Sequence, residues 1–82
     1  MSVIKHPLST EKGIRLMESE NKLIFIVEKS ATKAEIKADV ERLFAAKVID
    51  VSTLITKGIK KAYVRLSPET PAIDLATQLG LL

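Results

Sequence analysis

Residues 51–66 read VSTLITKGIKKAYVRL, and this stretch decides the predicted fold. Apolar and polar residues alternate on both sides of its single glycine, as expected for two strands of a hairpin. The first strand is predicted at residues 48–57 and the return strand at residues 60–66. Gly58 supplies the positive φ that a short connection needs, although Lys-Gly is a weaker turn signal than Asn-Gly. The stretch therefore predicts a tight antiparallel hairpin.

The hairpin also carries the excess positive charge of the chain. Residues 51–68 contain four cations, Lys57, Lys60, Lys61 and Arg65, and no acid. The other 64 residues hold nine cations and ten acids, so the net charge of +3 arises from this one stretch. A flat cationic ribbon suits a polyanion, and RNA is the first candidate. The alternative is a protein-interaction module that does not bind RNA, in which the lysines only protect an exposed edge strand from pairing with other chains.

Tyr63 lies between Lys61 and Arg65 on the polar face of the return strand. It can stack there on a base or a sugar, or it can act as an ordinary cross-strand packing residue. The two other aromatic residues, Phe25 and Phe44, are expected in the core. The chain therefore lacks the aromatic platform of an RRM-like protein, and recognition of RNA through phosphates and shape is the expected mechanism.

The sequence on either side of the hairpin predicts three helices and two further strands. Residues 22–28 are apolar on both faces, which indicates a strand in the interior of a sheet. Thr32 and Glu35 form a capping box for a helix over residues 32–46. A helix from Ser9 or Thr10 to about residue 19, an edge strand at residues 2–5 and a final helix of about eight residues before Gly80 complete the order β-α-β-α-β-β-α. This order predicts an α+β fold with a mainly antiparallel sheet.

The bulk composition predicts one folded domain over residues 1–82. With 46% apolar and 28% charged residues, the chain is too apolar for a disordered protein. It has no cysteine, which excludes a disulfide framework and fits a reducing compartment. No apolar run reaches the length of a membrane span and the N-terminus has no apolar leader, so we expect a cytoplasmic protein that does not insert into membranes.

Catalytic and metal-binding chemistry finds little support in the sequence. His6 is the single histidine, and without neighbouring ligands it cannot close a metal site. It is more plausible as an exposed loop residue or an RNA contact than as a ligand. The three glycines are scattered and form no phosphate-cradling motif. We therefore expect no enzyme and no cofactor.

Several short motifs in order resemble the ribosomal protein L23 family of the large subunit. They are IKHPLSTEK at residues 4–12, NKLIFIV at 21–27, ATKAEIK at 31–37, VERLF at 40–44, VSTL at 51–54 and KKAYVRL at 60–66. Each motif alone is weak, but together they cover nearly the whole chain in the order of the family. The first of them matches the [ST]-E-K motif with which members of the family open.

The resemblance implies a three-layer α+β fold, similar in size to a ferredoxin-like domain, with a four-stranded antiparallel sheet in the order 1-2-4-3. It implies binding to large-subunit rRNA beside the exit of the peptide tunnel, next to other ribosomal proteins, and docking of the signal recognition particle. It also implies that Glu11, which would otherwise be only an acid in the first turn of a helix, serves in this docking. Bacterial members have a long basic loop where Lys57-Gly58-Ile59 closes the hairpin here, so no tunnel-lining role is carried over. The short loop, the lack of the eukaryotic extension and the C-terminal helix look archaeal.

The candidate RNA-binding residues come from two regions of the chain. Four phosphate contacts alone support weak binding, with dissociation constants on the order of 10⁻⁴–10⁻⁶ M and a log–log salt slope of roughly −3 to −4. Tight binding therefore needs a second region, and the N-terminal segment offers one. The candidates are Lys5, His6, Lys12, Arg15, Thr53, Thr56, Lys57, Lys60, Lys61, Tyr63 and Arg65.

Overall fold

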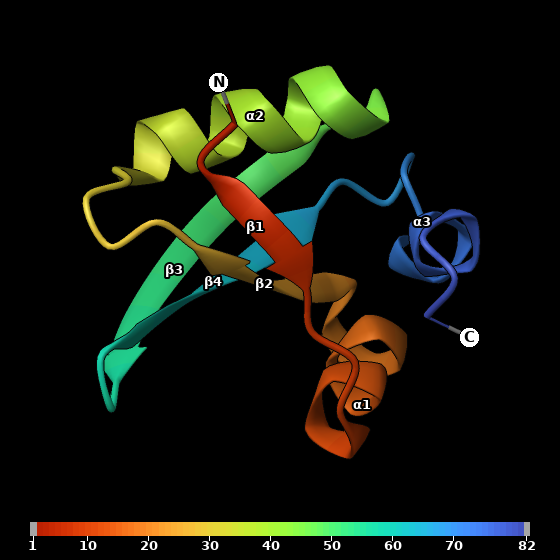
Figure 1. Cartoon of the computed structure of the whole chain (residues 1–82). Helices are drawn as coiled ribbons and strands as arrows, with labels where there is room; N and C mark the ends of the chain where they lie inside the picture. The colour runs from red at the N-terminus through yellow and green to blue at the C-terminus, as the bar shows by residue number, and fades with distance from the viewer. Residues whose placement is uncertain (1, 82) are drawn as a thin grey trace.

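The computed structural model describes residues 2–81 and shows an α+β fold in which three helices pack on a four-stranded sheet (Figure 1). The element order is the predicted one. The strands are β1 (Ile4–Pro7), β2 (Lys22–Val27), β3 (Val48–Thr56) and β4 (Ile59–Leu66), and the helices are α1 (Glu11–Glu20), α2 (Lys33–Phe44) and α3 (Ala72–Gln78).

The sheet is antiparallel and has the strand order β1-β2-β4-β3. This is the order that the family resemblance implied. β2 and β4 lie inside the sheet, while β1 and β3 form its edges. The interior position of β2 agrees with its apolar residues on both faces: Leu23, Ile24, Phe25 and Val27 are all buried.

One face of the sheet packs against α2 and contains most of the core. Phe25 on β2 stacks on Phe44 of α2, with ring centroids 5.7 Å apart. Ile36 and Val40 of the same helix are fully buried. The predicted capping box is present, because Glu35 donates its backbone N–H to the Thr32 hydroxyl and accepts from the Thr32 N–H through its carboxylate. These contacts fix α2 across the sheet.

The opposite face is covered at one end only, by α1 (Figure 1). Thr10 caps this helix by accepting a hydrogen bond from the Gly13 N–H at 3.0 Å. A Cβ on Gly13 would lie 3.5 Å from Cδ1 of Ile24, an ordinary contact distance, so the helix lies in van der Waals contact with β2 here. α3 packs beside α1 and contributes Ala72, Leu75 and Ala76 to the core.

Several predicted boundaries and faces need correction. The edge strand covers Ile4–Pro7 rather than residues 2–5; it holds Pro7 at its last position, where a missing N–H is tolerated. In β3 the register shifts between Val48 and Asp50, so Val48 and Val51 are both buried although strict alternation assigned them to opposite faces. Leu43, predicted on the apolar face of its helix, is 45% exposed.

The hairpin turn consists of Lys57 and Gly58 alone, because Thr56 and Ile59 already pair. Both turn residues have positive φ, 52° and 76°, as a type I′ turn requires. The predicted positive φ at Gly58 is confirmed. Lys57 adopts the same left-handed region without the help of a glycine, and the return strand therefore begins one residue earlier than predicted.

The start of α3 is held by the side chain of Asn21. The Asn21 side-chain carbonyl accepts a hydrogen bond of 2.6 Å from the N–H of Ala72, the first residue of the helix. The Thr70 hydroxyl instead accepts from the N–H of Lys47 at 3.3 Å. The helix covers Ala72–Gln78 and is followed by Gly80 at φ 74°.

Candidate nucleic-acid interface

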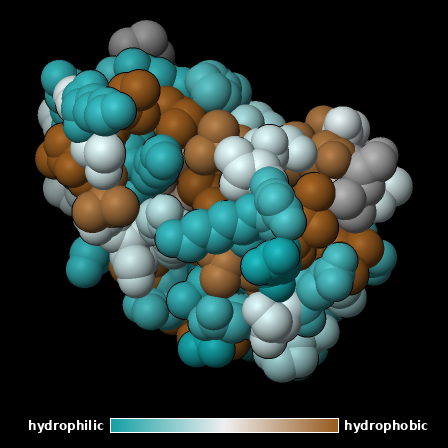
Figure 2. Space-filling model, turned by 90° about the horizontal axis from the view of Figure 1, so that it is seen from below, coloured by the Kyte–Doolittle hydropathy of each residue, from teal (hydrophilic) through white to brown (hydrophobic). Residues whose placement is uncertain are grey.

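The side of the sheet opposite α2 is open where α1 does not reach. We call this the open face, and it consists of His6, Ile26, Leu54, Ile59 and Lys61. Their strand register puts them on the same side: His6 pairs with Ile26, Ile26 with Lys61, and Lys61 with Leu54. From below, on the side of α1, polar and apolar residues are interspersed over the surface (Figure 2). The open face is thus a mixed surface rather than a purely apolar one.

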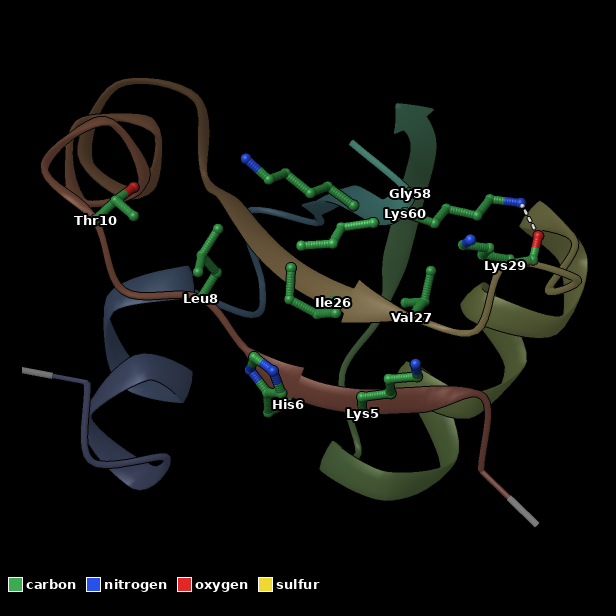
Figure 3. A pocket seen from close by; sticks show the side chains of 11 residues that line it. Lys5, His6, Leu8, Thr10, Ile26, Val27, Lys29, Gly58 and Lys60 are labelled. Atoms are coloured by element: carbon green, nitrogen blue, oxygen red, sulfur yellow. Dashed lines mark hydrogen bonds between the residues drawn. The ribbon is translucent and has the colours of Figure 1, made fainter. Parts of the chain in front are cut away.

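A groove of about 470 Å³ lies on this face, between β1 and the hairpin (Figure 3). Its floor is aliphatic and includes Leu8, Ile26 and Ile59. Its rim carries cations, among them Lys5, Lys29 and Lys61. None of the side chains that line the groove in residues 2–81 is acidic. The groove therefore offers apolar contact in its centre and positive charge around it.

Two segments far apart in the sequence form the walls of the groove. In Figure 3, Lys5 and His6 lie on β1 and Lys60 and Gly58 lie on the hairpin, with Ile26 of β2 between them. The loop after β2 approaches the turn, since a Cβ on Gly58 would lie 3.4 Å from Nζ of Lys29. The two regions that the sequence offered for RNA binding therefore meet at one site.

Lys60 has a structural role in addition to its positive charge. Its ammonium donates hydrogen bonds to the backbone carbonyls of Ala31 at 2.6 Å and of Lys29 at 3.2 Å. The bond to Lys29 is drawn in Figure 3. Its neighbour Ala62 on the same face of β4 is fully buried on the α2 side. Lys60 thus ties the hairpin to the loop that leads into α2, and part of its hydrogen-bonding capacity is already used.

Tyr63 is half-buried beside α1 rather than displayed on a free surface. It pairs with Ile24 on β2 and with Ser52 on β3. The ammonium of Lys12 lies over its ring, 5.9 Å from the centroid, within the range of a cation–π contact. Tyr63 therefore packs across the strands and holds Lys12 near the open face, and its stacking on RNA stays a prediction.

Glu11 and Arg15 form an exposed ion pair on the first turns of α1. Their side chains are 3.1 Å apart and remain 85% and 78% exposed. Such a pair contributes little to stability, so both groups are free to meet a partner. Arg65 lies at the other end of the sheet, where its Nε is 3.5 Å from the carbonyl oxygen of Glu20.

The remaining candidates lie along the hairpin. Thr53 pairs with Ala62 on the α2 side and is half-buried. Thr56 is exposed and pairs with Ile59 next to the turn, and Lys57 is exposed in the turn itself. The structure therefore brings Lys5, His6 and Lys61 to one groove but separates them from Arg65 and Thr53.

Asp39 of α2 fixes the segment that precedes β1. Its carboxylate accepts hydrogen bonds from the Val3 N–H at 2.6 Å and the Ser2 hydroxyl at 3.0 Å, and it pairs with Arg42 at 3.1 Å. The Val3 N–H is the main cause of a lowered pKa of the Asp39 carboxyl; partial burial opposes it, and Arg42 and Ser2 add to the lowering. Lys5 and His6, which follow directly, are thereby held at the groove.

Sequence reasoning missed three contributors to this site. Lys29 was assigned no role, Ile26 was treated only as a strand residue, and Ile59 was placed in the connection of the hairpin. β2 carries apolar residues on both faces, and this pattern could have indicated the site. An apolar residue on an uncovered face of a sheet forms a surface patch. Its meaning depended on how far α1 extends over the sheet, which is a tertiary feature.

The edge-protection interpretation of the lysines does not hold for β4. Lys60 and Lys61 belong to a strand that pairs on both sides, with β2 and with β3.

Among residues 2–81, no group of histidine, cysteine, aspartate or glutamate side chains is arranged to hold a metal ion. Within the same residues, no helix has the length and apolar character to cross a membrane.

Most of this chain matches a known protein family. The sequence model described as "Ribosomal protein L23" matches residues 2–72 of this chain. The matched region contains all four strands, α1 and α2, and ends at the first residue of α3. It therefore includes the whole sheet, the short hairpin and the groove. The chain belongs to the ribosomal protein L23 family, whose members are proteins of the large ribosomal subunit.

Proposed function

We propose that this protein binds large-subunit rRNA through the open face and the adjoining cations of β1, α1 and the hairpin turn. The observation that carries the proposal is the groove, where Lys5, Lys29 and Lys61 surround an aliphatic floor without an acid among the described lining residues. Because the chain belongs to a ribosomal protein family, rRNA is the expected polyanionic partner. The family is generally structural and non-enzymatic, and we expect no catalytic activity.

The mechanism is neutralisation of phosphates by cations that the fold holds in place. Lys5 and Lys61 come from different strands, and Lys12 is positioned over Tyr63 from α1. Cations from three elements along one side suit a folded RNA that presents phosphates from more than one strand segment. Each phosphate neutralised adds about 0.7–0.9 to the magnitude of the log–log salt slope.

The test compares two triple variants that remove the same charge. Lys5→Gln, Lys57→Gln and Lys61→Gln change the groove side, whereas Lys33→Gln, Lys37→Gln and Lys47→Gln change exposed residues on or next to α2. With deproteinised large-subunit rRNA, we expect the first variant to lower the magnitude of the salt slope by roughly 2–3 and the control to change it by less than 1. Equal losses in both variants would mean that net charge, not this face, drives binding.

We further propose that Glu11 belongs to a docking surface for the signal recognition particle. Its support is the family resemblance together with its 85% exposed side chain at the start of α1. Glu11→Lys should weaken co-sedimentation of the particle with ribosomes while leaving rRNA binding intact. Glu18→Lys, which changes another exposed acid of the same helix, is the matched control. If Glu11→Lys loses rRNA binding, Glu11 belongs to the rRNA interface, and its proposed role in docking is wrong.

We also propose that the protein is of the archaeal type, that residues 1–82 act as one rRNA-binding domain, and that it works within cytoplasmic ribosomes next to other ribosomal proteins. The turn of only Lys57 and Gly58 supports the archaeal assignment. A second hollow of about 540 Å³ next to the half-exposed Ile49 and Ile73 offers a contact surface for a neighbouring protein. Absence of this protein from purified large subunits would contradict its proposed place in the ribosome.

A further inference from the structure

We propose that the groove between β1 and the hairpin is a subsite for one unstacked nucleotide, whose base enters the aliphatic floor while its phosphates meet the surrounding lysines. This inference rests on the proposed function, since it concerns how the same face binds RNA. It adds a site and a mode of recognition: a base removed from its helix, held by shape and apolar contact.

The first argument is the size and lining of the groove. Its volume of about 470 Å³ exceeds that of a single nucleotide, and Ile26 and Ile59 supply aliphatic surface at its centre. A phosphate backbone alone gains nothing from such a floor, because its oxygens need charge and hydrogen-bond donors. A base has a flat apolar face that water solvates poorly, so it gains free energy by covering aliphatic surface.

The second argument is the exposure of Ile59. This side chain is 48% exposed although it lies in an ordered strand of the central sheet. On the open face it has Lys61 two residues along the same strand. A single exposed isoleucine is ordinary, but Ile59 lies on the same face as Ile26 and the 50% exposed Leu54. Such a patch bordered by cations suits a ligand with an apolar centre and an anionic rim.

The third argument is the charge around the floor. Lys60 already donates to two carbonyls, whereas Lys5, Lys29 and Lys61 have no acidic partner among the ion pairs of residues 2–81. The Lys29 ammonium lies close to the turn at Gly58, on the opposite wall from Lys5. Phosphates on either side of one extruded base would therefore each meet a lysine. A nucleotide has the base and the phosphates that this groove would bind. Because the chain belongs to a ribosomal protein family, we expect the nucleotide to be part of an RNA.

The test uses a short single-stranded oligoadenylate RNA that carries one 2-aminopurine, whose fluorescence rises when the base leaves the stack. The full-length protein should raise this fluorescence on binding. A fully paired duplex of the same length with the same label is the matched RNA control and should show no rise. Absence of a rise with the single strand would overturn the subsite.

The protein variants separate the subsite from general phosphate binding. Ile59→Ala should weaken binding of the single strand roughly fivefold to tenfold, from lost apolar contact, without changing the salt slope. Ile55→Ala removes an isoleucine of the same hairpin that is 59% exposed on the other face, and it should change binding by less than twofold. Thermal unfolding of both variants checks that the hairpin remains folded, and Ile59→Val, which keeps the strand preference, should give an intermediate loss.

The outcomes distinguish this inference from the proposed function. If Ile59→Ala binds the single strand as well as wild type while the groove-side lysine variant loses its rRNA salt dependence, the subsite is wrong and rRNA binding by this face stands. If wild type shows no salt-dependent binding to large-subunit rRNA, the proposed function fails. If an acidic peptide displaces the oligoadenylate and binds more tightly, the groove is a protein site and the subsite is equally wrong.

Discussion

Asn21 joins three segments of the chain through one side chain. Its backbone lies in the left-handed region at φ 55°, where it ends α1. Its amide nitrogen lies 3.0 Å from the carbonyl of Leu66, 3.1 Å from that of Ser67 and 3.3 Å from that of Thr70. Together with its bond to Ala72, these contacts connect the end of α1, the end of β4 and the start of α3.

Replacing Asn21 should therefore destabilise the whole fold. Asn21→Ala removes these hydrogen bonds and leaves an alanine in a left-handed conformation, so we expect the free energy of unfolding to fall by about 2–4 kcal/mol. Asn21→Gly removes the same hydrogen bonds but accepts the backbone conformation, and its loss should be smaller by about 1 kcal/mol. Urea unfolding of the three proteins measures both differences, and an Asn21→Ala variant as stable as wild type would contradict this role.

Asp39 makes the stability of the fold depend on pH. Because the pKa of Asp39 in the folded protein is lowered from 3.8, chiefly by the Val3 N–H, the folded state favours the charged carboxylate. The stabilisation from this group is complete above the unfolded-state pKa and is lost as the pH falls through the lowered folded-state value.

Asp39→Asn should accordingly be less stable than wild type at neutral pH, by about 1–2 kcal/mol. The difference should shrink as the pH falls below about 4, where the wild-type carboxyl takes up its proton. Urea unfolding of both proteins over this range tests the sign. A difference that grows toward acid pH would mean that another group determines the acid sensitivity.

At the level of the elements, two adjacent lysines of β4 have different roles. Lys60 stabilises the fold through hydrogen bonds, and Lys61 is available at the surface. Lys60→Met keeps the aliphatic stem but loses the hydrogen bonds to Ala31 and Lys29, and should lower the free energy of unfolding by about 1–2 kcal/mol. Lys61→Met should leave unfolding unchanged within about 0.5 kcal/mol and reduce the magnitude of the rRNA salt slope by roughly 1. Identical behaviour of the two variants in both measurements would contradict the division of roles.

Local patterns in the sequence predicted the elements well where the signal is itself local. Thr32 and Glu35 form the predicted capping box, and the first helix ends at Glu20, within one residue of the predicted end. The bulge at Ile49 was not predictable, because Val48, Ile49 and Val51 are all apolar and the sequence does not show which two of them share the buried face. The reach of Lys60 across to Ala31 depends on contacts between distant segments and leaves no trace in the local sequence.

The strand order shows the same limit at a larger scale. β4 lies between β2 and β3, and its pairing with β2 joins segments about 40 residues apart. The alternation of hydrophobic residues carried no information on this pairing, and the order 1-2-4-3 came from the family resemblance. The order also decides how the lysines are interpreted, since edge protection applies to an edge strand and β4 is not one.

At the scale of the whole molecule, α1 and α2 cover the sheet unequally. α2 packs across one face and buries its centre, while α1 leaves the groove end of the other face open (Figure 1). The net charge of +3 is accompanied by cations from β1, α1 and β4 on this open side. The candidate interface is therefore a product of tertiary arrangement: the N-terminal segment and the hairpin each supply part of it.

The most direct test of this interface is lysine acetylation of the protein in intact large subunits and in free solution, read residue by residue by mass spectrometry. The proposed interface predicts that Lys5, Lys12 and Lys61 react in the free protein and are protected in the subunit. Large subunits in which these three lysines remain as reactive as in the free protein would contradict binding of rRNA by the open face.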